Sequence, residues 1–272
     1  MTRHALYQSV IFLLLCTGPL FARELPDTAI FLSNRTAFTV PRGQFESGLI
    51  QPMRFGLSNR VELSAHPILI FADPQVMVKV RWKQTGCILI SSEHRIACPT
   101  PLMRLFTTAG AGGLISPQFT IPVMASVYNG IITTGEFADK SLITAKAGII
   151  FALGAGKLDQ LSRIDLPVIY PREAVFYHQP VIDLALDYRC PVPGKLECLL
   201  ASEYFIIPGT HDNFFFEHRL NLLWKPGAHI LLQGGYRLCY GLYPFGKQWH
   251  LLPDIDIAFH FGRNFGATKD HP

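Results

Sequence analysis

The feature of this sequence that most constrains its fold is a repeated alternation of apolar and polar side chains with a period of two. In residues 214–224 the even positions are mostly apolar and the odd positions mostly polar, and residues 230–240 repeat the pattern after a turn at 225–227. Such alternation indicates β-strands whose two faces meet different surroundings, because successive side chains of a strand point to opposite sides. Each segment has about 10 residues, the length that a tilted strand needs to cross a membrane.

Four further segments alternate in the same way, namely 76–83, 143–153, 182–189 and 255–262. At about 20 to 25 residues for each strand with its connection, the chain has room for about 10 to 12 strands. The sequence therefore predicts an all-β fold, a transmembrane antiparallel up-and-down β-barrel. A soluble β-sandwich also alternates, but aromatic residues at or near the strand ends favour a barrel with aromatic girdles. These residues are Trp82, Tyr188, Tyr204, Trp224, Tyr240 and Trp249.

The composition agrees either with a large buried core or with a surface that faces lipid. Only 16% of the residues are charged and 49% are hydrophobic, whereas roughly a quarter are charged in an ordinary soluble domain. The uncharged stretch 105–135 is long enough for a spanning helix, but Pro117, Pro122 and several glycines indicate strand and loop. A membrane protein with this sequence has to be a barrel, because only helices and closed barrels span bilayers.

The N-terminus predicts export. Residues 4–22 carry no Lys, Arg, Asp or Glu, have an apolar stretch at 10–16, and end on Leu20-Phe21-Ala22, an acceptable cleavage site. The expected organisation is a signal peptide at 1–22, an N-terminal segment at 23–42 with room for a first strand, a barrel at 43–265 and a tail at 266–272. The expected location is the bacterial outer membrane, with lipid, lipopolysaccharide and the barrel-assembly machinery as partners.

The cysteine spacing predicts two disulfides in an exported protein. Cys87 and Cys98 flank one polar loop, and Cys190 and Cys198 flank another that contains Pro and Gly, which leaves Cys239 free. A zinc site would need closely spaced pairs, which are absent. We expect no metal and no cofactor.

Strand parity places many charges in the lumen, and the two signs balance at seven each. A strongly selective pore would show an excess of one sign, so the balance predicts either an interior cross-linked by salt bridges or a weakly selective channel. Contact with a solute is the alternative for Lys79, Arg81, Glu62 and His66. The lumen-lining candidates are Glu46, Arg54, Glu62, His66, Lys79, Arg81, Lys83, Lys146, Asp183, Asp187, Glu203, Glu217, Arg219, Arg237 and Asp256.

The function that these features predict is a passive porin-like channel or transport protein for a small solute, without catalytic residues. Two alternatives stay open: a closed structural or binding barrel, and a soluble periplasmic β-sandwich that binds a ligand. A barrel hydrolase is less favoured, because His-x-Ser is absent and His211-Asp212 has no acidic pair beside it. The formal net charge of +4, with no basic cluster, argues against nucleic acid.

Residues 41–82 contain a block that resembles a known family. The block comprises Pro41-Arg42-Gly43, residues 54–67 (RFGLSNRVELSAHP) and Lys79-Val80-Arg81-Trp82. It resembles largely uncharacterised bacterial outer-membrane β-barrels, similar in style to the porin-like proteins of phenol meta-cleavage gene clusters. The resemblance implies an outer-membrane barrel and says little about what crosses it.

The turn within this block also makes physical sense, since Gly56 and Asn59 can take the positive φ of a tight turn. If the turn is periplasmic, a further strand within 28–40 is needed to keep the N-terminus periplasmic. Proteobacterial barrels usually end on an aromatic residue, whereas here Phe265 is followed by the tail 266–272. The assembly signal is therefore expected at Phe261 or Phe265.

Overall fold

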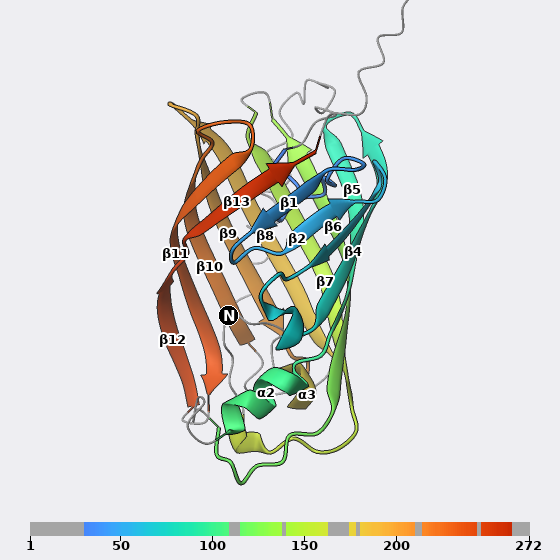
Figure 1. The fold of residues 1–272 in the computed structure, drawn as a ribbon, viewed down its shortest axis with the longest axis vertical. Helices are drawn as coiled ribbons and strands as arrows, with labels where there is room; N and C mark the ends of the chain where they lie inside the picture. The colour runs from blue at the N-terminus through green and yellow to red at the C-terminus, as the bar shows by residue number, and fades with distance from the viewer. Residues whose placement is uncertain are drawn as a thin grey trace, which may run out of the picture.

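The computed structural model describes residues 30–108, 115–137, 140–162, 174–177, 180–209, 214–243 and 246–262. In these ranges the chain forms one closed antiparallel sheet (Figure 1). Its strands are β1 (Phe45–Gly48), β2 (Met53–Gly56), β3 (Val61–Ala65), β4 (Gln75–Thr85), β5 (Ile88–Ala97), β6 (Met124–Glu136), β7 (Leu142–Gly154), β8 (Val181–Val192), β9 (Leu196–Ile206), β10 (Phe214–Trp224), β11 (Ile230–Tyr243), β12 (Gly246–Pro253) and β13 (Asp256–Phe261).

The segments β12 and β13 are two parts of one strand. Tyr236 of β11 pairs with Pro253 and Gln233 pairs with Asp256, so the register along β11 continues unchanged across the break at 254–255. The wall is therefore a twelve-stranded barrel that closes where β1 pairs with β13. This confirms the predicted all-β up-and-down barrel of 10 to 12 strands.

The two faces of the wall follow the predicted alternation. In β8, for example, odd positions such as Asp183 are buried inside, while Leu184 and Leu186 are exposed outside. The prediction for Lys83 was wrong, because a register shift between Arg81 and Lys83 pairs Lys83 with Ile90 and leaves its side chain exposed. A β-bulge of this kind reverses the side-chain parity beyond it.

The height of the wall is uneven. The ladder between β6 and β7 has thirteen residue pairs, whereas β1 pairs with β13 at only four positions. Residues 30–42 form no strand, so the strand expected within 28–40 is absent from the described part of that range. The first strand of the described residues is β1, which begins at Phe45. We call the rim where β1 begins and β13 ends the upper rim, as it lies in Figure 1.

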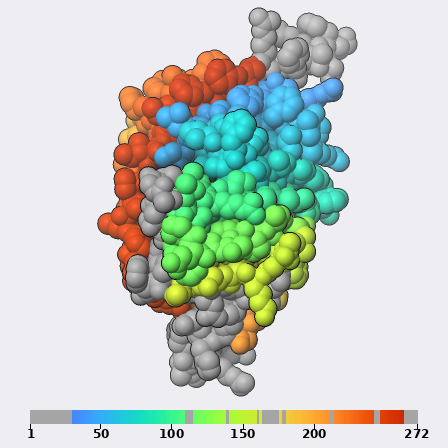
Figure 2. Space-filling view, turned by 60° about the horizontal axis from the view of Figure 1, so that its bottom comes forward, coloured from blue at the N-terminus to red at the C-terminus, as the bar shows by residue number. Residues whose placement is uncertain are grey.

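The opposite, lower rim carries two helices, α2 (Thr100–Thr107) and α3 (Ala174–Tyr177), and Gln160–Ser162 forms a short 3-10 turn (η2). In Figure 2, turned so that this end comes forward, the green part of the chain that includes α2 forms a continuous surface. Two apolar clusters fill this end: one contains Met103, Ile115, Ile121 and Met124, and the other contains Val175 of α3. Among the described residues, no helix has the length and hydropathy of a membrane span.

No disulfide joins any two of the five cysteines of the described residues. Cys87 precedes β5 and Cys98 follows it, so the ten residues of this strand, at about 3.3 Å each, hold the two sulfurs far apart and exclude the predicted bond. Cys190 and Cys198 are direct partners across β8 and β9. The predicted signal peptide and the tail 266–272 lie outside the described residues.

The turn after β2 needs its glycine for a different reason from the one predicted. Neither Gly56 nor Asn59 has a positive φ, whereas Gly43 does, at 73°. A Cβ on Gly56 would lie 2.1 Å from the carbonyl oxygen of Pro41. Glycine is therefore needed here because the chain of residues 40–43 passes directly over β2, and Gly43 N–H donates to Gly56 O at 2.9 Å.

Candidate functional site

Residues 30–42 lie inside the barrel, and we call them the plug. Lys79 of β4, which is 2% exposed, points its ammonium group at the plug backbone. It donates hydrogen bonds to the carbonyl oxygens of Ser33, Thr36 and Phe38, at 2.6, 3.0 and 3.3 Å. A single buried cation thus ties three peptide groups of the plug to the wall.

Two wall carboxylates bind hydrogen-bond donors of the plug, whereas Lys79 binds its acceptors. Glu46 accepts from the Phe31 N–H at 2.7 Å and from the Ser33 hydroxyl at 3.1 Å. Glu62 accepts from the Val40 N–H at 2.8 Å and lies 3.7 Å from the Lys79 ammonium group. These carboxylates therefore satisfy backbone donors that a strand would otherwise satisfy, which explains how a segment without strand pairing stays buried.

The plug also packs against apolar parts of the wall. Phe38 and Ala37 lie in a buried cluster with Leu89 and Ile132, and Phe31 lies in another with Leu231. The Ala37 N–H donates to the Thr134 hydroxyl at 2.8 Å. Arg189, an inward residue that the sequence analysis missed although it shares the face of Asp183 and Asp187, donates to Phe31 O at 3.0 Å.

Two other candidates hold the turn between β1 and β2 instead of facing open space. The Asp256 carboxylate accepts from the backbone N–H groups of Leu49, Ile50 and Gln51, at 2.9, 2.9 and 3.1 Å. His66 Nδ1 accepts from two backbone N–H groups, so Nε2 carries the proton and donates to Ile50 O at 2.7 Å. Both residues therefore stabilise the turn that joins β1 to β2.

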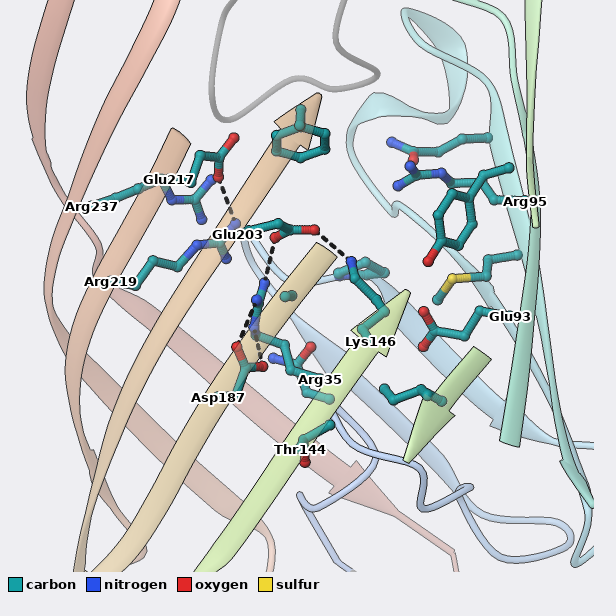
Figure 3. Close-up of a pocket in the computed structure, with 18 residues that line it drawn as sticks. Arg35, Glu93, Arg95, Thr144, Lys146, Asp187, Glu203, Glu217, Arg219 and Arg237 are labelled. Carbon is teal, nitrogen blue, oxygen red and sulfur yellow. Dashed lines mark hydrogen bonds and ion pairs between the residues drawn. The ribbon is translucent and has the colours of Figure 1, made fainter. Parts of the chain in front are cut away.

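Between the plug and the lower apolar clusters lies a cavity of about 230 Å³, which we call the chamber (Figure 3). Asn34 and Arg35 of the plug form its upper boundary, and Tyr128 and Phe205, which also belong to a lower cluster, lie at its other end. Five Arg or Lys side chains and four Asp or Glu side chains line it. They are Arg35, Arg95, Lys146, Arg219 and Arg237, with Glu93, Asp187, Glu203 and Glu217.

One side of the chamber is a tight ion-pair network. Arg35 Nε lies 2.8 Å from the Asp187 carboxylate and its Nη1 lies 3.1 Å from Glu203. Lys146 bridges Glu203 and Asp183, with 3.0 Å to the latter. Burial alone would lower the pKa of Arg35, but the carboxylates of Asp187 and Glu203 raise it well above its ordinary value, so the plug carries a permanent cation here.

The facing side of the chamber is built around Tyr128 of β6. Its ring lies over Gly130 and Gly148, where a Cβ would come within 2.1 and 2.4 Å of ring atoms. The Arg95 guanidinium lies 5.2 Å from the ring centroid and the Lys146 ammonium group 5.7 Å. Among the residues that the structure describes, the buried Tyr128 hydroxyl has no hydrogen-bond partner. Figure 3 shows Arg95 and Glu93 on one side of the chamber and Arg219 and Arg237 on the other.

The remaining candidates are distributed around these centres. Arg54 lies 3.7 Å from Glu46, Arg219 pairs with Glu217 at 3.1 Å, and Arg237 lies 3.5 Å from Asp254. Arg81 is half-buried. Two chamber residues were missed. Arg95 lies on β5, in the segment between Cys87 and Cys98 that was expected to be a polar loop. Arg35 lies in the plug, whose residues show no periodicity from which an inward side chain could be predicted.

No protein-family model and no curated protein sequence matches the chain. Among solved structures it is similar to OmpT of Vibrio cholerae, with 9% identity and a TM-score of 0.42 over 77% of this chain and 64% of OmpT. The chain thus spans slightly less than two thirds of that protein.

Two further similarities are of the same kind. A bacterial polysaccharide outer-membrane secretin has 8% identity and a TM-score of 0.43 over 78% of this chain and 68% of its own. The outer-membrane channel DcaP of Acinetobacter baumannii has 11% identity and a TM-score of 0.34 over 90% and 68%. At these identities the function has to be argued from the side chains of this chain.

Proposed function

We propose that this protein is an outer-membrane β-barrel that passes a small hydrophilic solute, and that the plug closes it in the conformation described here. The outer face of the wall is apolar along the alternating strands, while the lumen holds paired charges, which is the arrangement of a barrel in lipid and the reverse of a water-soluble sandwich. The block at 41–82 that resembles outer-membrane barrels supports the same location.

The observation that carries the proposal is the way in which the plug is held. Its backbone binds to charged side chains of the wall, chiefly Lys79, Glu46 and Glu62. In the described part of the chain no backbone hydrogen bond joins residues 30–42 to the backbone of a strand. Displacing the plug therefore breaks side-chain contacts and leaves every ladder of the barrel intact. The plug can thus leave the lumen without unfolding the barrel, and a polar chamber lies directly beneath it. These two features favour a channel that the plug opens and closes over a barrel with a permanently filled interior.

A first experiment tests the location. Membrane fractionation should place the protein with the outer membrane, and the unboiled protein should migrate faster in electrophoresis than the boiled one. Recovery in the soluble periplasm would contradict a barrel in lipid.

A second experiment tests the gate by planar-bilayer conductance. Ser91 donates a hydrogen bond to Ala37 O, so the double variant Ala37→Cys/Ser91→Cys can tie the plug to β5. We expect rare openings in the wild type, none in the oxidised double variant and their return after reduction. The single variants are the controls, because each keeps the native cysteines but lacks the lock. Openings that persist in the oxidised double variant would overturn a plug-gated path.

A closed binding barrel is the second candidate, because both ends of the chamber are covered: the plug covers the upper end and the apolar clusters with α2 and α3 the lower end. This candidate predicts silence in the bilayer even when the plug is released. The variant Lys79→Met/Glu62→Gln releases the plug while it removes one charge of each sign. Conductance from this variant distinguishes the two candidates.

The disulfide between Cys190 and Cys198 stays part of the proposal. Direct partners in an antiparallel ladder have Cα atoms about 4.5 to 5.5 Å apart, within the range that a disulfide bridges. In an exported protein we expect these two thiols to resist labelling until a reductant is added. Equal labelling before and after reduction would contradict the bond.

A further inference from the structure

We propose that the chamber binds a small organic monocarboxylate, held by Tyr128 and Arg95. This inference names a class of solute for the proposed function. It rests on that function only in taking the bound molecule to be the solute that the barrel transports. The binding site itself stands on the geometry of the chamber wall.

The first observation is the Tyr128 hydroxyl. The residue is 3% exposed, lines the chamber and has a buried hydroxyl oxygen without a hydrogen-bond partner. Leaving a buried hydroxyl unpaired is unfavourable, and native proteins rarely do so unless a water or ligand completes the bond. Gly130 and Gly148 leave the space in which the ring lies flat, so the hydroxyl is held in a fixed position.

The second observation is the Arg95 guanidinium. In the described part of the chain it contacts the face of the Tyr128 ring and no carboxylate lies within ion-pair distance of it, since the nearby Glu93 pairs with Lys79 at 3.5 Å. Arg95 acts on Asp73 only electrostatically. A planar guanidinium over the face of a phenol ring, together with the unpaired hydroxyl of that ring, offers donors for the two oxygens of a carboxylate.

The third observation is the charge of the lining. Of the five cations that line the chamber, Arg35, Lys146, Arg219 and Arg237 each lie within 3.5 Å of a carboxylate, and two of those carboxylates, Asp183 and Asp254, lie beyond the lining. Arg95 has no such partner in the described part of the chain. A single negative charge balances it, whereas a dianion such as phosphate would meet the four carboxylates unfavourably. The Nε of Arg219, also without a partner, adds a further donor.

The size and the remaining surface set the body of the ligand. A volume of about 230 Å³ corresponds to about eight waters at about 30 Å³ each. Met77, Ile132 and Phe205 contribute apolar atoms to the lining. A compact molecule with one carboxylate and a small apolar body fits both features, and we use benzoate as the probe, with benzamide as its neutral isostere.

The experiment is isothermal titration of the folded, detergent-solubilised full-length barrel with benzoate, benzamide and inorganic phosphate. We expect benzoate to bind, benzamide to bind at least about tenfold more weakly, and phosphate to compete poorly. Arg95→Met should weaken benzoate at least about tenfold, and Tyr128→Phe about three- to tenfold, because each removes a hydrogen bond to a charged group. Lys83→Met is the matched control, because it removes an exposed, outward cation from the wall.

Each variant is first checked for the fast-migrating folded band. Equal binding of benzoate and benzamide, or unchanged affinity in folded Arg95→Met, would overturn the carboxylate site, and stronger binding of phosphate would replace it with a phosphate site. The conductance experiment is independent of this one. Binding without conductance would keep the site and reject the channel, whereas conductance without binding would keep the channel and reject the site.

Discussion

The upper lumen and the chamber contain similar charges that perform different tasks. In the upper lumen Lys79, Glu46 and Glu62 form hydrogen bonds with peptide groups of the plug, so the chain itself satisfies these charged groups. In the chamber, Lys146 and Glu203 bind other side chains. Among the described residues, the Arg95 guanidinium has no carboxylate partner and the Tyr128 hydroxyl has no hydrogen-bond partner. The comparison teaches that an inward charge is structural or functional according to what occupies the lumen beside it.

The largest effect is expected from Lys79→Met. The change removes three hydrogen bonds to the plug and leaves Glu62 and Glu93 buried without their cation. Breaking a buried pair in this way costs about 3–5 kcal/mol. The urea concentration that abolishes the fast-migrating band should fall accordingly. The double variant Lys79→Met/Glu62→Gln should recover part of the lost stability. If Lys79→Met alone were as stable as the wild type, the charges of the upper lumen would not have the structural role that separates them from those of the chamber.

A smaller effect is expected from Arg35→Met, which cuts the link between the regions. Arg35 belongs to the plug but binds Asp187 and Glu203 of the chamber. Since Lys146 still neutralises Glu203, we expect a loss of about 1.5–3 kcal/mol, the usual range for hydrogen bonds to a charged group. The open probability in planar bilayers should rise. A plug that stays equally closed would mean that the upper contacts alone retain it.

Gly130→Ala should act on the chamber and leave the plug in place. The new Cβ would lie 2.1 Å from the Tyr128 hydroxyl oxygen and push the ring into the cavity. The cost should fall at the lower end of the about 1–3 kcal/mol typical of overpacking, because the ring has empty space to enter. Gly135→Ala on the same strand, with nothing within 4 Å of its Cβ, is the control. Equal urea midpoints for the two variants would contradict the fixed ring.

Arg95→Met should have the smallest effect on stability. Arg95 loses only its contact with the Tyr128 ring, worth about 0.5–1 kcal/mol. Lys79→Met and Arg95→Met each remove one inward cation, so their urea midpoints measure the comparison directly. If Arg95→Met lowered the urea midpoint as much as Lys79→Met does, Arg95 would also be needed to stabilise the fold.

The sequence predicted the barrel because a wall of alternating strands repeats one rule along most of its length. The rule places Lys146, Asp183 and Glu217 inside correctly, and it fails at Lys83, where a single bulge reverses the faces. Hairpin ladders are local and periodic, so their faces can be predicted from spacing alone. Contacts between distant segments have no such signal.

The plug illustrates this limit. Residues 30–42 show no period, and their partners Lys79, Glu62 and Arg189 lie far along the chain, on β4, β3 and β8. The balanced inward charges were predicted to cross-link the lumen or to line a weakly selective channel. What no pattern indicated is that many of them bind a segment of the same chain.

The short ladder between β1 and β13 has a consequence for assembly. Glu46 of β1 lies at this ladder, opposite His260 of β13 at 3.7 Å, and the same carboxylate accepts the Phe31 N–H and the Ser33 hydroxyl of the plug. A wall closed around an empty lumen would leave this buried carboxylate without those donors. The pairing of β1 with β13 and the binding of residues 30–42 inside the barrel therefore stabilise one another through a single carboxylate.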